Sequence, residues 1–257
     1  MSFPEQGISP DMSYSEPCIQ ADRPKSRASL PTRLFSRIIA HWERKLLLTL
    51  ALNLFFWVGY AWLGHHAVFP LRNVPATWLD TLIQFSPQPW GWIYLSQFLY
   101  TGTLPWLINS KPGLRRYVVG LLWMCSISFL AFLFFPTVGP RVEYHGQNFA
   151  VALIQHYDGA LNAFPSLHAA FLVYTFALGW RLFPGRIPPS FIGVCLLWAG
   201  LILYSTLATK QHYTLDLMAG CLLGFGADRL AWGNFAGCKE ARTMSRSSGS
   251  ASQAGII

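Results

Sequence analysis

The sequence has 257 residues, of which 53% are hydrophobic, 16% are aromatic and only 12% are charged. This apolar excess excludes a disordered chain and argues against an ordinary soluble domain. The formal net charge is +8 at pH 7, but the basic residues form no aromatic-interleaved patch of the kind that binds nucleic acid, so no nucleic-acid partner is expected.

The two ends of the chain differ from its middle in composition. Residues 1–45 are polar, contain five prolines that interrupt helices, and lack the apolar stretch and cleavage site of a signal peptide. We therefore expect residues 1–45 to form a disordered basic tail. Residues 233–257 are rich in Ser, Gly and Ala, and this composition predicts a second disordered tail.

Between the tails, six apolar runs are each long enough to cross the roughly 30 Å hydrocarbon core as a helix that rises about 1.5 Å per residue. They cover residues 46–63, 90–109, 117–135, 166–183, 190–208 and 212–230. Pro105 interrupts the second run. The predicted fold is an all-α polytopic membrane protein with six transmembrane helices, and residues 46–232 form its membrane domain.

The positions of the basic residues predict the orientation of these runs, because Lys and Arg near span ends are retained on the cytoplasmic side. Sixteen of the 19 lie in the two tails and in the connections after the second and fourth runs. The alternate connections hold only Arg72, Arg141 and Lys210. Both termini are therefore predicted to be cytoplasmic, and most of the positive charge reflects topology.

Polar residues gather in three segments on the predicted extracytoplasmic side. The first, FPTVGPR, follows the third run and ends at Arg141, although an arginine at this edge could also merely extend to water. The second is FPSLH, where Ser166 marks a helix start and His168 lies one turn inside. Free N–H groups and the helix dipole at such a start favour an anion, but a single histidine there can equally be structural.

The third segment, STLATKQHYTLD, crosses from the fifth run into the sixth. His212 and Asp216 are four residues apart, so on a helix they share a face, and Asp216 can hold the imidazole in one tautomer. This pair is half of a nucleophile and orienter arrangement. A carboxylate inside a membrane helix is costly and is a functional candidate by default, although the pair could also only staple the loop.

Together these segments resemble the motifs of the type 2 phosphatidic acid phosphatase superfamily, membrane lipid phosphatases that share an active-site design with vanadium haloperoxidases. The family pattern is a Lys six residues before Arg-Pro, then Pro-Ser-Gly-His, then Ser-Arg, five residues, His, three residues and Asp. Here Ser205 and Thr206 begin the third part, and the spacing to His212 and Asp216 is intact. The resemblance covers roughly half of the chain.

Three positions depart from the family pattern. The lysine before Arg141 is absent, Leu167 replaces the glycine of the second motif, and Thr206 replaces the arginine of the third. Two phosphate-binding cations are thus missing, and Lys210 is a candidate to restore one of them. The forms FPSLH and TKQHYTLD are most similar to the branch of inositol phosphorylceramide synthases and their bacterial relatives, in which an alcohol accepts the phosphoryl-type group.

The resemblance implies a metal-independent enzyme without a cofactor that acts through a phosphohistidine. His212 is implied to attack phosphorus, and Asp216 to orient the imidazole of His212. His168 is implied to protonate the leaving oxygen. The groups implied to bind the phosphate are Arg141, Lys210 and the backbone N–H groups near Ser166.

The implied substrate is a phosphomonoester or diphosphate lipid, hydrolysed on the extracytoplasmic face of the bilayer. The alternative is a lipid head-group phosphotransferase of the inositol phosphorylceramide synthase type, with an alcohol as acceptor. We expect the protein in a bacterial inner (plasma) membrane, with its active site facing the periplasm or the exterior.

Two other classes of function also use intramembrane His and Asp. A transporter is expected to place them near the bilayer midplane on broken helices with repeat symmetry, whereas here they lie at span ends. A metalloenzyme could use His168, His212 and Asp216 as ligands, but the HExxH spacing is missing and neighbouring basic residues would repel a cation. No metal site is therefore expected.

Two connections are expected to hold interfacial helices. Residues 138–163 include FAVALIQHYDGAL, whose mixed apolar and polar character favours a short helix at the membrane surface. The titratable residues of this connection are interpreted as solvated loop residues rather than ligands: Glu143, His145, His156 and Asp158. Residues 75–85 are expected to form another surface helix, anchored by Trp78.

Overall fold

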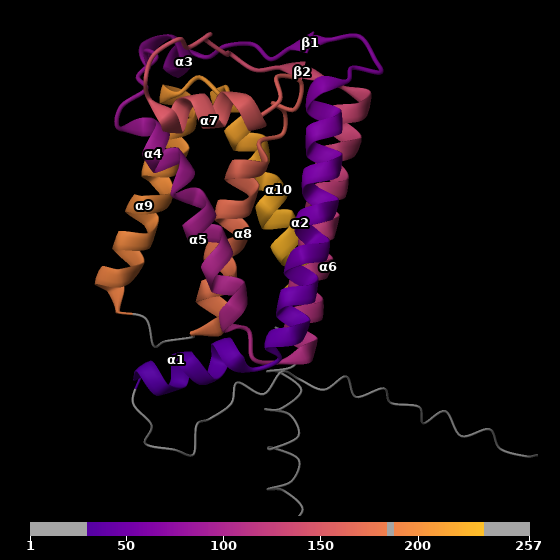
Figure 1. The fold of residues 1–257 in the computed structure, drawn as a ribbon, viewed down its shortest axis with the longest axis vertical. Coiled ribbons are helices and arrows are strands. Elements are labelled where there is room, and N and C mark those ends of the chain that lie inside the picture. The colour runs from indigo at the N-terminus through magenta and orange to yellow at the C-terminus, as the bar shows by residue number, and fades with distance from the viewer. Residues whose placement is uncertain (1–29, 184–187, 234–257) are drawn as a thin grey trace, which may run out of the picture. The chain divides into compact units, whose positions relative to one another are not determined.

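The computed structural model describes residues 30–183 and 188–233, and most of them are helical. The upright helices in Figure 1 form the body of this part of the chain. They are α2 (Trp42–His65), α6 (Lys111–Phe134), α8 (Leu167–Leu182), α9 (Pro189–Ala208) and α10 (Thr214–Trp232). Helix α10 packs against both α8 and α6, and α2 packs along α6.

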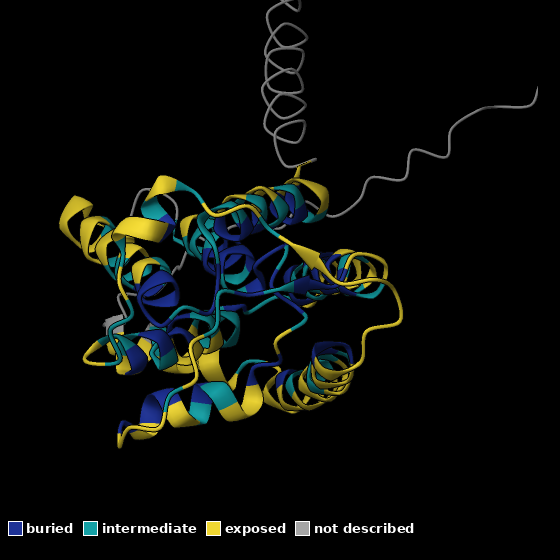
Figure 2. Ribbon diagram, turned by 90° about the horizontal axis from the view of Figure 1, so that it is seen from above, coloured by how far each residue is buried: buried dark blue, intermediate teal, exposed yellow. Residues whose placement is uncertain are grey.

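Three of the described helices, α2, α6 and α9, are long and apolar enough to cross a membrane. Their outer faces carry large apolar side chains that no other part of the described chain covers. In Figure 2 the outward sides of the helical ribbons are yellow, the colour of exposed residues. On α2, for example, Leu47, Leu54 and Val58 are 66%, 68% and 62% exposed. Apolar side chains arranged in this way suit lipid rather than water, so the fold is that of an integral membrane protein.

The other three predicted spans take less regular forms, and six spans stay a prediction. The run around Pro105 is divided among α4 (Trp90–Leu95), α5 (Gln97–Thr103) and the 3₁₀ helix η1 (Leu104–Leu107). Helix α8 has 16 residues, close to the shortest length that spans a bilayer. Helix α10 has 19 residues but includes Asp216, Asp228 and Arg229.

The buried charge in α10 is compensated by α8. Arg181 donates from Nε to Oδ1 of Asp228 over 2.9 Å and from Nη2 to Oδ2 over 2.6 Å. A two-pronged ion pair of this kind satisfies both carboxylate oxygens. Asp228 can therefore lie inside a helical bundle without leaving an unpaired charge.

Glycines bring α8 and α10 into close contact. A Cβ atom on Gly220 would lie 2.1 Å from the carbonyl oxygen of Ser166, and one on Gly224 would lie 2.4 Å from that of Ala170. The pair is a GxxxG motif, which allows the backbones of membrane helices to approach. This contact places the start of α8 directly against the start of α10.

The segment before α2 is more ordered than the sequence predicted. Residues 30–45, expected to belong to a disordered tail, form α1 (Leu30–Ile39) and the first turn of α2. Pro31 is tolerated in the first turn of α1, where its missing N–H would have no partner. Lys45 Nζ donates to the carbonyls of Arg37 and Trp106 over 2.6 Å each. The rest of that tail and residues 234–257 lie outside the described residues.

The end of the bundle opposite α1 is covered by short elements (Figure 1). Helix α7 (Phe149–Tyr157) lies within the predicted surface segment, and α3 (Trp78–Leu82) lies within the segment at 75–85. Strands β1 (Arg72–Asn73) and β2 (Thr137–Val138) pair in parallel, with Arg72 opposite Thr137. These connections hold the loops in which the predicted site residues lie.

Candidate functional site

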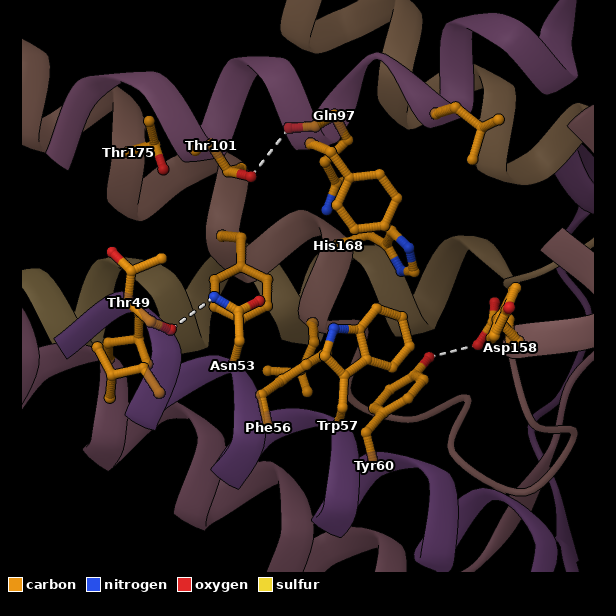
Figure 3. A pocket seen from close by; sticks show the side chains of 18 of the residues that line it. Thr49, Asn53, Phe56, Trp57, Tyr60, Gln97, Thr101, Asp158, His168 and Thr175 are labelled. Carbon is orange, nitrogen blue, oxygen red and sulfur yellow. Dashed lines mark hydrogen bonds between the residues drawn. The ribbon is translucent and has the colours of Figure 1, made fainter. Parts of the chain in front are cut away.

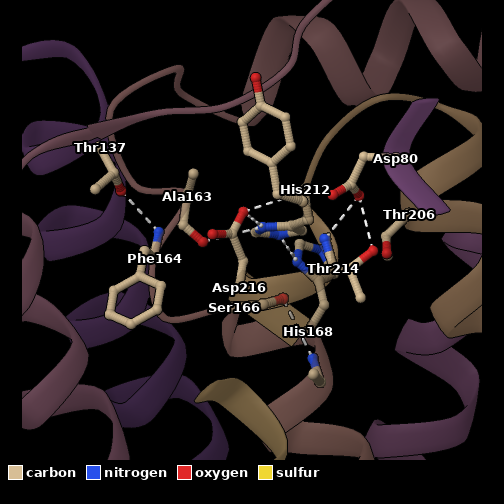
Figure 4. A network of polar contacts seen from close by, with 12 residues as sticks. Asp80, Thr137, Ala163, Phe164, Ser166, His168, Thr206, His212, Thr214 and Asp216 are labelled. Atoms are coloured by element: carbon tan, nitrogen blue, oxygen red, sulfur yellow. Dashed lines mark hydrogen bonds and ion pairs between the residues drawn. The ribbon is translucent and has the colours of Figure 1, made fainter. Parts of the chain in front are cut away.

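The structure brings the second and third predicted segments together, as His168, His212 and Asp216 in Figure 4 show. His168 is the second residue of α8, and His212 lies in the connection between α9 and α10. Nδ1 of His168 is 3.2 Å from Nε2 of His212. His212 is only 3% exposed, whereas His168 is partly exposed. Two histidines that are 44 residues apart in sequence thus form one contact.

The protonation of His212 follows from its second nitrogen. Nδ1 of His212 is 3.0 Å from the carbonyl oxygen of Ala163. Because a carbonyl can only accept a hydrogen bond, Nδ1 carries the proton in the neutral imidazole. Nε2 then keeps its lone pair and points at His168, which donates from Nδ1. The arrangement provides a nucleophilic nitrogen next to a proton donor.

Asp216 lies beside His212, but in a different geometry from the predicted helix face. His212 precedes the first turn of α10, and Oδ2 of Asp216 accepts from the backbone N–H of Tyr213 over 2.8 Å. Nδ1 of His212 is 3.6 Å from the same oxygen, which is too long for a hydrogen bond. Asp216 therefore acts on the imidazole by its charge, while the Ala163 carbonyl orients the ring.

Ser166 has a structural part in this arrangement. It is the N-cap residue of α8, and its Oγ accepts from the N–H of Ala169 over 3.4 Å. Its own N–H donates to the carbonyl of Asp216 over 3.0 Å. This N–H is therefore engaged, and the next N–H groups in the first turn, those of Leu167 and His168, are the ones without intrahelical acceptors.

Arg141 is held by the loop that precedes α8. Its guanidinium donates to the backbone carbonyls of Asp158 and Gly159, and Nη2 is 3.4 Å from the Asp158 carboxylate. The Asp158 carboxylate in turn accepts from the hydroxyls of Tyr60 and Tyr94, the latter over 3.0 Å. This group of four side chains, Asp158 with Tyr60, Tyr94 and Arg141, is called the Asp158 cluster below.

The interpretation of Asp158 as a solvated loop residue is wrong, because the residue is only 9% exposed. Burial by itself raises the pKa of the Asp158 carboxyl, but Arg141, followed by His168 and His212, outweighs burial and keeps this pKa below its usual value. The ring of Tyr94 also lies 4.7 Å from that of His168. The Asp158 cluster therefore adjoins the histidine pair. The exposed Glu143, His145 and His156 lie outside it.

Lys210 lies in the third predicted segment, and its ammonium is held by backbone carbonyls in and after α3. Its Nζ donates to the backbone carbonyls of Asp80 and Ile83 over 2.8 and 2.5 Å. The residue has a φ of 53°, which is unusual for a residue with a side chain. In this structure Lys210 ties the α3 segment to the loop before α10.

Asp80 is a second buried carboxylate that the sequence interpretation missed. Its Oδ1 accepts from the N–H and the hydroxyl of Thr214, and its Oδ2 accepts from those of Thr77, over 2.7 to 2.8 Å. Burial raises the pKa of Asp80, but these hydrogen bonds outweigh it and lower the pKa. The Thr-x-x-Asp pattern at 77–80 is a capping-box signal, but nothing local pointed to Thr214.

An apolar cavity of about 740 Å³ leads to this site (Figure 3). It lies between α2 on one side and α5 and α8 on the other, and we call it the slot. His168 and Asp158 line one end, Phe56, Trp57 and Phe171 line its middle, and Thr49 and Thr101 lie toward the other end. An apolar cavity that ends at ionisable groups is typical of a ligand site for a molecule with an apolar body and a polar head.

Among residues 30–183 and 188–233, no three His, Cys, Asp or Glu side chains are grouped so that they could hold a metal.

Comparison with known proteins gives one result. The family model described as the PAP2 superfamily matches residues 37–229, which is most of the chain and includes the segments of Arg141, His168 and His212. Neither the curated proteins nor the solved structures contain a significant match. Membership implies a phosphatase-like enzyme that acts on a lipid phosphate, and it supports no particular branch. From its helical fold, its paired histidines and this match, the chain belongs to the PAP2 superfamily.

Proposed function

We propose that this protein is an integral membrane enzyme that transfers the phosphoryl group of a lipid phosphate by way of a phosphohistidine at His212. The observation that carries the proposal is the 3.2 Å contact between Nε2 of His212 and Nδ1 of His168, with Nδ1 of His212 held by a carbonyl. The nucleophilic nitrogen, its orienting group and a proton donor are thereby assembled before substrate binds.

In the first step the Nε2 lone pair forms a bond to phosphorus, and the bond from phosphorus to the lipid oxygen breaks. His168, protonated on both ring nitrogens in the complex with substrate, gives one proton to that leaving oxygen and becomes neutral. In the second step a water oxygen attacks phosphorus, the phosphorus–nitrogen bond breaks, and His168 takes a proton from the water. The charge of Asp216 stabilises the positive imidazole of the intermediate across 3.6 Å.

Arg141 is the proposed cation for the phosphate oxygens, because it lies in the Asp158 cluster next to His168 and its guanidinium nitrogen Nε has no hydrogen-bond partner among the described residues. The N–H groups at the start of α8 add the positive end of a helix dipole. The contribution of Lys210 that the sequence suggested would require its ammonium to leave the carbonyls of Asp80 and Ile83.

The charge of the site favours a second candidate, transfer to an alcohol from a phosphodiester lipid. Arg141 is paired with Asp158, and Lys210 is engaged elsewhere, so the described site offers little net positive charge. A phosphomonoester carries about −1.5 to −2 at neutral pH, whereas a phosphodiester carries a single negative charge. A head-group phosphotransferase of the inositol phosphorylceramide synthase type acts on a phosphodiester, so its site would need to neutralise only one negative charge.

The proposed location of the active site is the extracytoplasmic face of a bacterial inner membrane. In its support, the ends of α8 and α10 that carry Arg181 and Arg229 lie toward α1 (Figure 1), whereas the histidine pair lies at the opposite end of the bundle. The basic residues near α1 agree with the cytoplasmic side of a membrane.

The test uses the full-length protein in detergent with EDTA and lipids labelled at phosphorus, with water alone or with added inositol, diacylglycerol or ceramide. Label released as phosphate indicates hydrolysis, and label on an acceptor indicates transfer. Brief reaction followed by alkaline denaturation should leave acid-labile label on the wild type and none on His212→Ala. Label that persists on the His212→Ala variant would rule out the proposed intermediate.

A further inference from the structure

The slot is apolar, but one buried amide lines it close to the histidine pair. Gln97, the first residue of α5, is only 5% exposed, and its Oε1 has no hydrogen-bond partner within the described chain. Figure 3 shows its side chain reaching toward the cavity beside His168. A buried amide oxygen without a partner is costly in an apolar bundle, so its position needs an explanation.

Two other polar side chains of the slot, those of Thr101 and Asn53, have partners within their own helices. The Thr101 hydroxyl donates to the backbone carbonyl of Gln97 over 2.9 Å, and Asn53 Nδ2 donates to that of Thr49 over 2.8 Å. Such bonds satisfy a side chain without help from a ligand. Gln97 therefore differs from Thr101 and Asn53 in having a buried side-chain oxygen that no described residue satisfies, so this end of its amide is available to a molecule in the slot.

The distance of Gln97 from the histidine pair can be estimated along the helix. The Tyr94 ring lies 4.7 Å from the His168 ring. Gln97 follows three residues later, which is about 4.5 Å further along a helical backbone, on the side away from α7. A lipid whose phosphate lies at His168 and His212 would place the groups a few bonds below the phosphate next to this amide.

In phospholipids with acyl chains, the group at that depth is the ester or amide carbonyl that joins the chain to the backbone. A polyprenyl phosphate has only hydrocarbon there. We propose that Gln97 hydrogen-bonds this carbonyl, and that the slot selects acylated lipid phosphates over isoprenoid ones. Because a primary amide can turn about its last bond, it can offer the N–H donor that a carbonyl requires. This inference rests on the proposed function and names its substrate class.

The test compares phosphatidic acid and phosphatidylinositol, each in its diacyl form and in a dialkyl ether form that lacks only the carbonyls. Wild-type kcat/KM should be about 5- to 10-fold higher for the diacyl form, as expected for one hydrogen bond. In Gln97→Met, a substitution of similar length without the amide, this ratio should fall to near one. The ratio is independent of how much of the variant folds.

The matched control is Ser128→Ala, because Ser128 is a fully buried polar residue of α6 that does not line the slot. It should keep the wild-type ratio. Ceramide phosphate and a polyprenyl phosphate extend the series. A preference for ceramide phosphate would indicate that Gln97 binds an amide carbonyl, and a preference for the diacyl lipids that it binds an ester carbonyl. The polyprenyl phosphate, which has only hydrocarbon at that depth, should be the poorer substrate. A wild-type ratio near one, or an unchanged ratio in Gln97→Met, would overturn the inference.

A binding measurement separates this inference from the proposed function. Thermal stabilisation of the His212→Ala variant by the diacyl and dialkyl lipids reports occupancy of the slot without chemistry. In one outcome the wild type turns over no lipid, yet the diacyl lipid raises the melting temperature more than the dialkyl lipid does, and Gln97→Met removes this difference. The proposed chemistry is then wrong and the proposed subsite is correct. In the other outcome lipids are turned over, but the two lipids raise the melting temperature equally, so the proposed subsite is wrong and the proposed chemistry is correct.

Discussion

The contact between α8 and α10 and the gap between α2 and α5 are built in opposite ways. At the first, Gly220 and Gly224 allow the backbone of α10 to touch that of α8, and the histidine pair lies at the end of this contact. At the second, large aromatic residues of α2 and α8 leave a cavity of about 740 Å³.

This difference separates the two requirements of a lipid enzyme. Reacting groups must be held to within a fraction of an ångström, and close backbone packing achieves that. A lipid chain needs space and an apolar lining, and the loosely packed α2 side supplies both. Changes at the α8–α10 contact should therefore affect catalysis and stability, and changes in the slot should affect the choice of substrate.

The largest effect is expected from His212→Ala, which removes the proposed nucleophile at the end of the tight contact. Turnover of lipid phosphate should fall by roughly 10⁴-fold or more, because residues that act as one catalytic unit fail together. Phosphate release measures this, with gel filtration as the check of folding. His168→Ala should give a comparable loss. Turnover near wild type in either variant would contradict the two-histidine mechanism.

A single methyl group should distinguish the tight contact from an open helix surface. Gly220→Ala would put its Cβ 2.1 Å from the Ser166 carbonyl oxygen, so the helices must separate. We expect a free energy of unfolding about 1 to 3 kcal/mol lower, with activity reduced because Ser166 begins the helix of His168. Gly200→Ala on α9 is the matched control, since no atom lies within 4 Å of its added Cβ. Equal effects of the two substitutions would refute this account of the contact.

Asp158→Asn tests the cluster between the two regions through the pH dependence of stability. The pKa of Asp158 is lowered from 3.8 in the folded protein. A lowered pKa contributes stability that is present above 3.8 and is lost as the pH falls through the folded value. Melting temperatures of the wild type should therefore fall steeply below about pH 4. The Asn variant should start lower and show a flatter decline, whereas identical pH profiles would contradict an ionised Asp158.

The smallest effect on chemistry is expected from Lys210→Met. Because its ammonium lies on the carbonyls of Asp80 and Ile83, we expect a stability loss of about 1 to 2 kcal/mol. The inhibition constant for inorganic phosphate should stay within about twofold of the wild type, since no phosphate contact is removed. A tenfold weaker inhibition would mean instead that Lys210 reaches the phosphate, as the sequence suggested.

Some features of the fold were accessible from sequence because they depend on local patterns. Apolar runs identified the segments of α2, α6 and α9, which the structure forms as long apolar helices. Pro105 indicated where the second run would be irregular. Helix α1 was missed because Pro31 and the basic residues around it suggested a tail, whereas tertiary contacts hold this segment, such as the bonds from Lys45 to the carbonyls of Arg37 and Trp106.

The residues of the site also differ in how far local sequence patterns revealed them. His168 and His212 could be singled out because each lies in a short motif of fixed spacing, and the structure brings the two rings into contact. Their catalytic roles stay a prediction. Asp158 was misjudged because its partners, Tyr94 and Tyr60, are 64 and 98 residues away. The direction of Lys210 could not be predicted either, since its acceptors lie 130 and 127 residues earlier.

The amino-acid sequence by itself determined the class of protein and the residue types that its short motifs bring together, because hydrophobicity and motif spacing are properties of neighbouring residues. Tertiary structure decided which nitrogen of His212 faces His168, since the other nitrogen is held by the Ala163 carbonyl 49 residues away. It also decided the burial of Asp158 and the slot lined by Gln97. Burial and the partners of a polar group are set by packing between distant segments, and no local pattern encodes them.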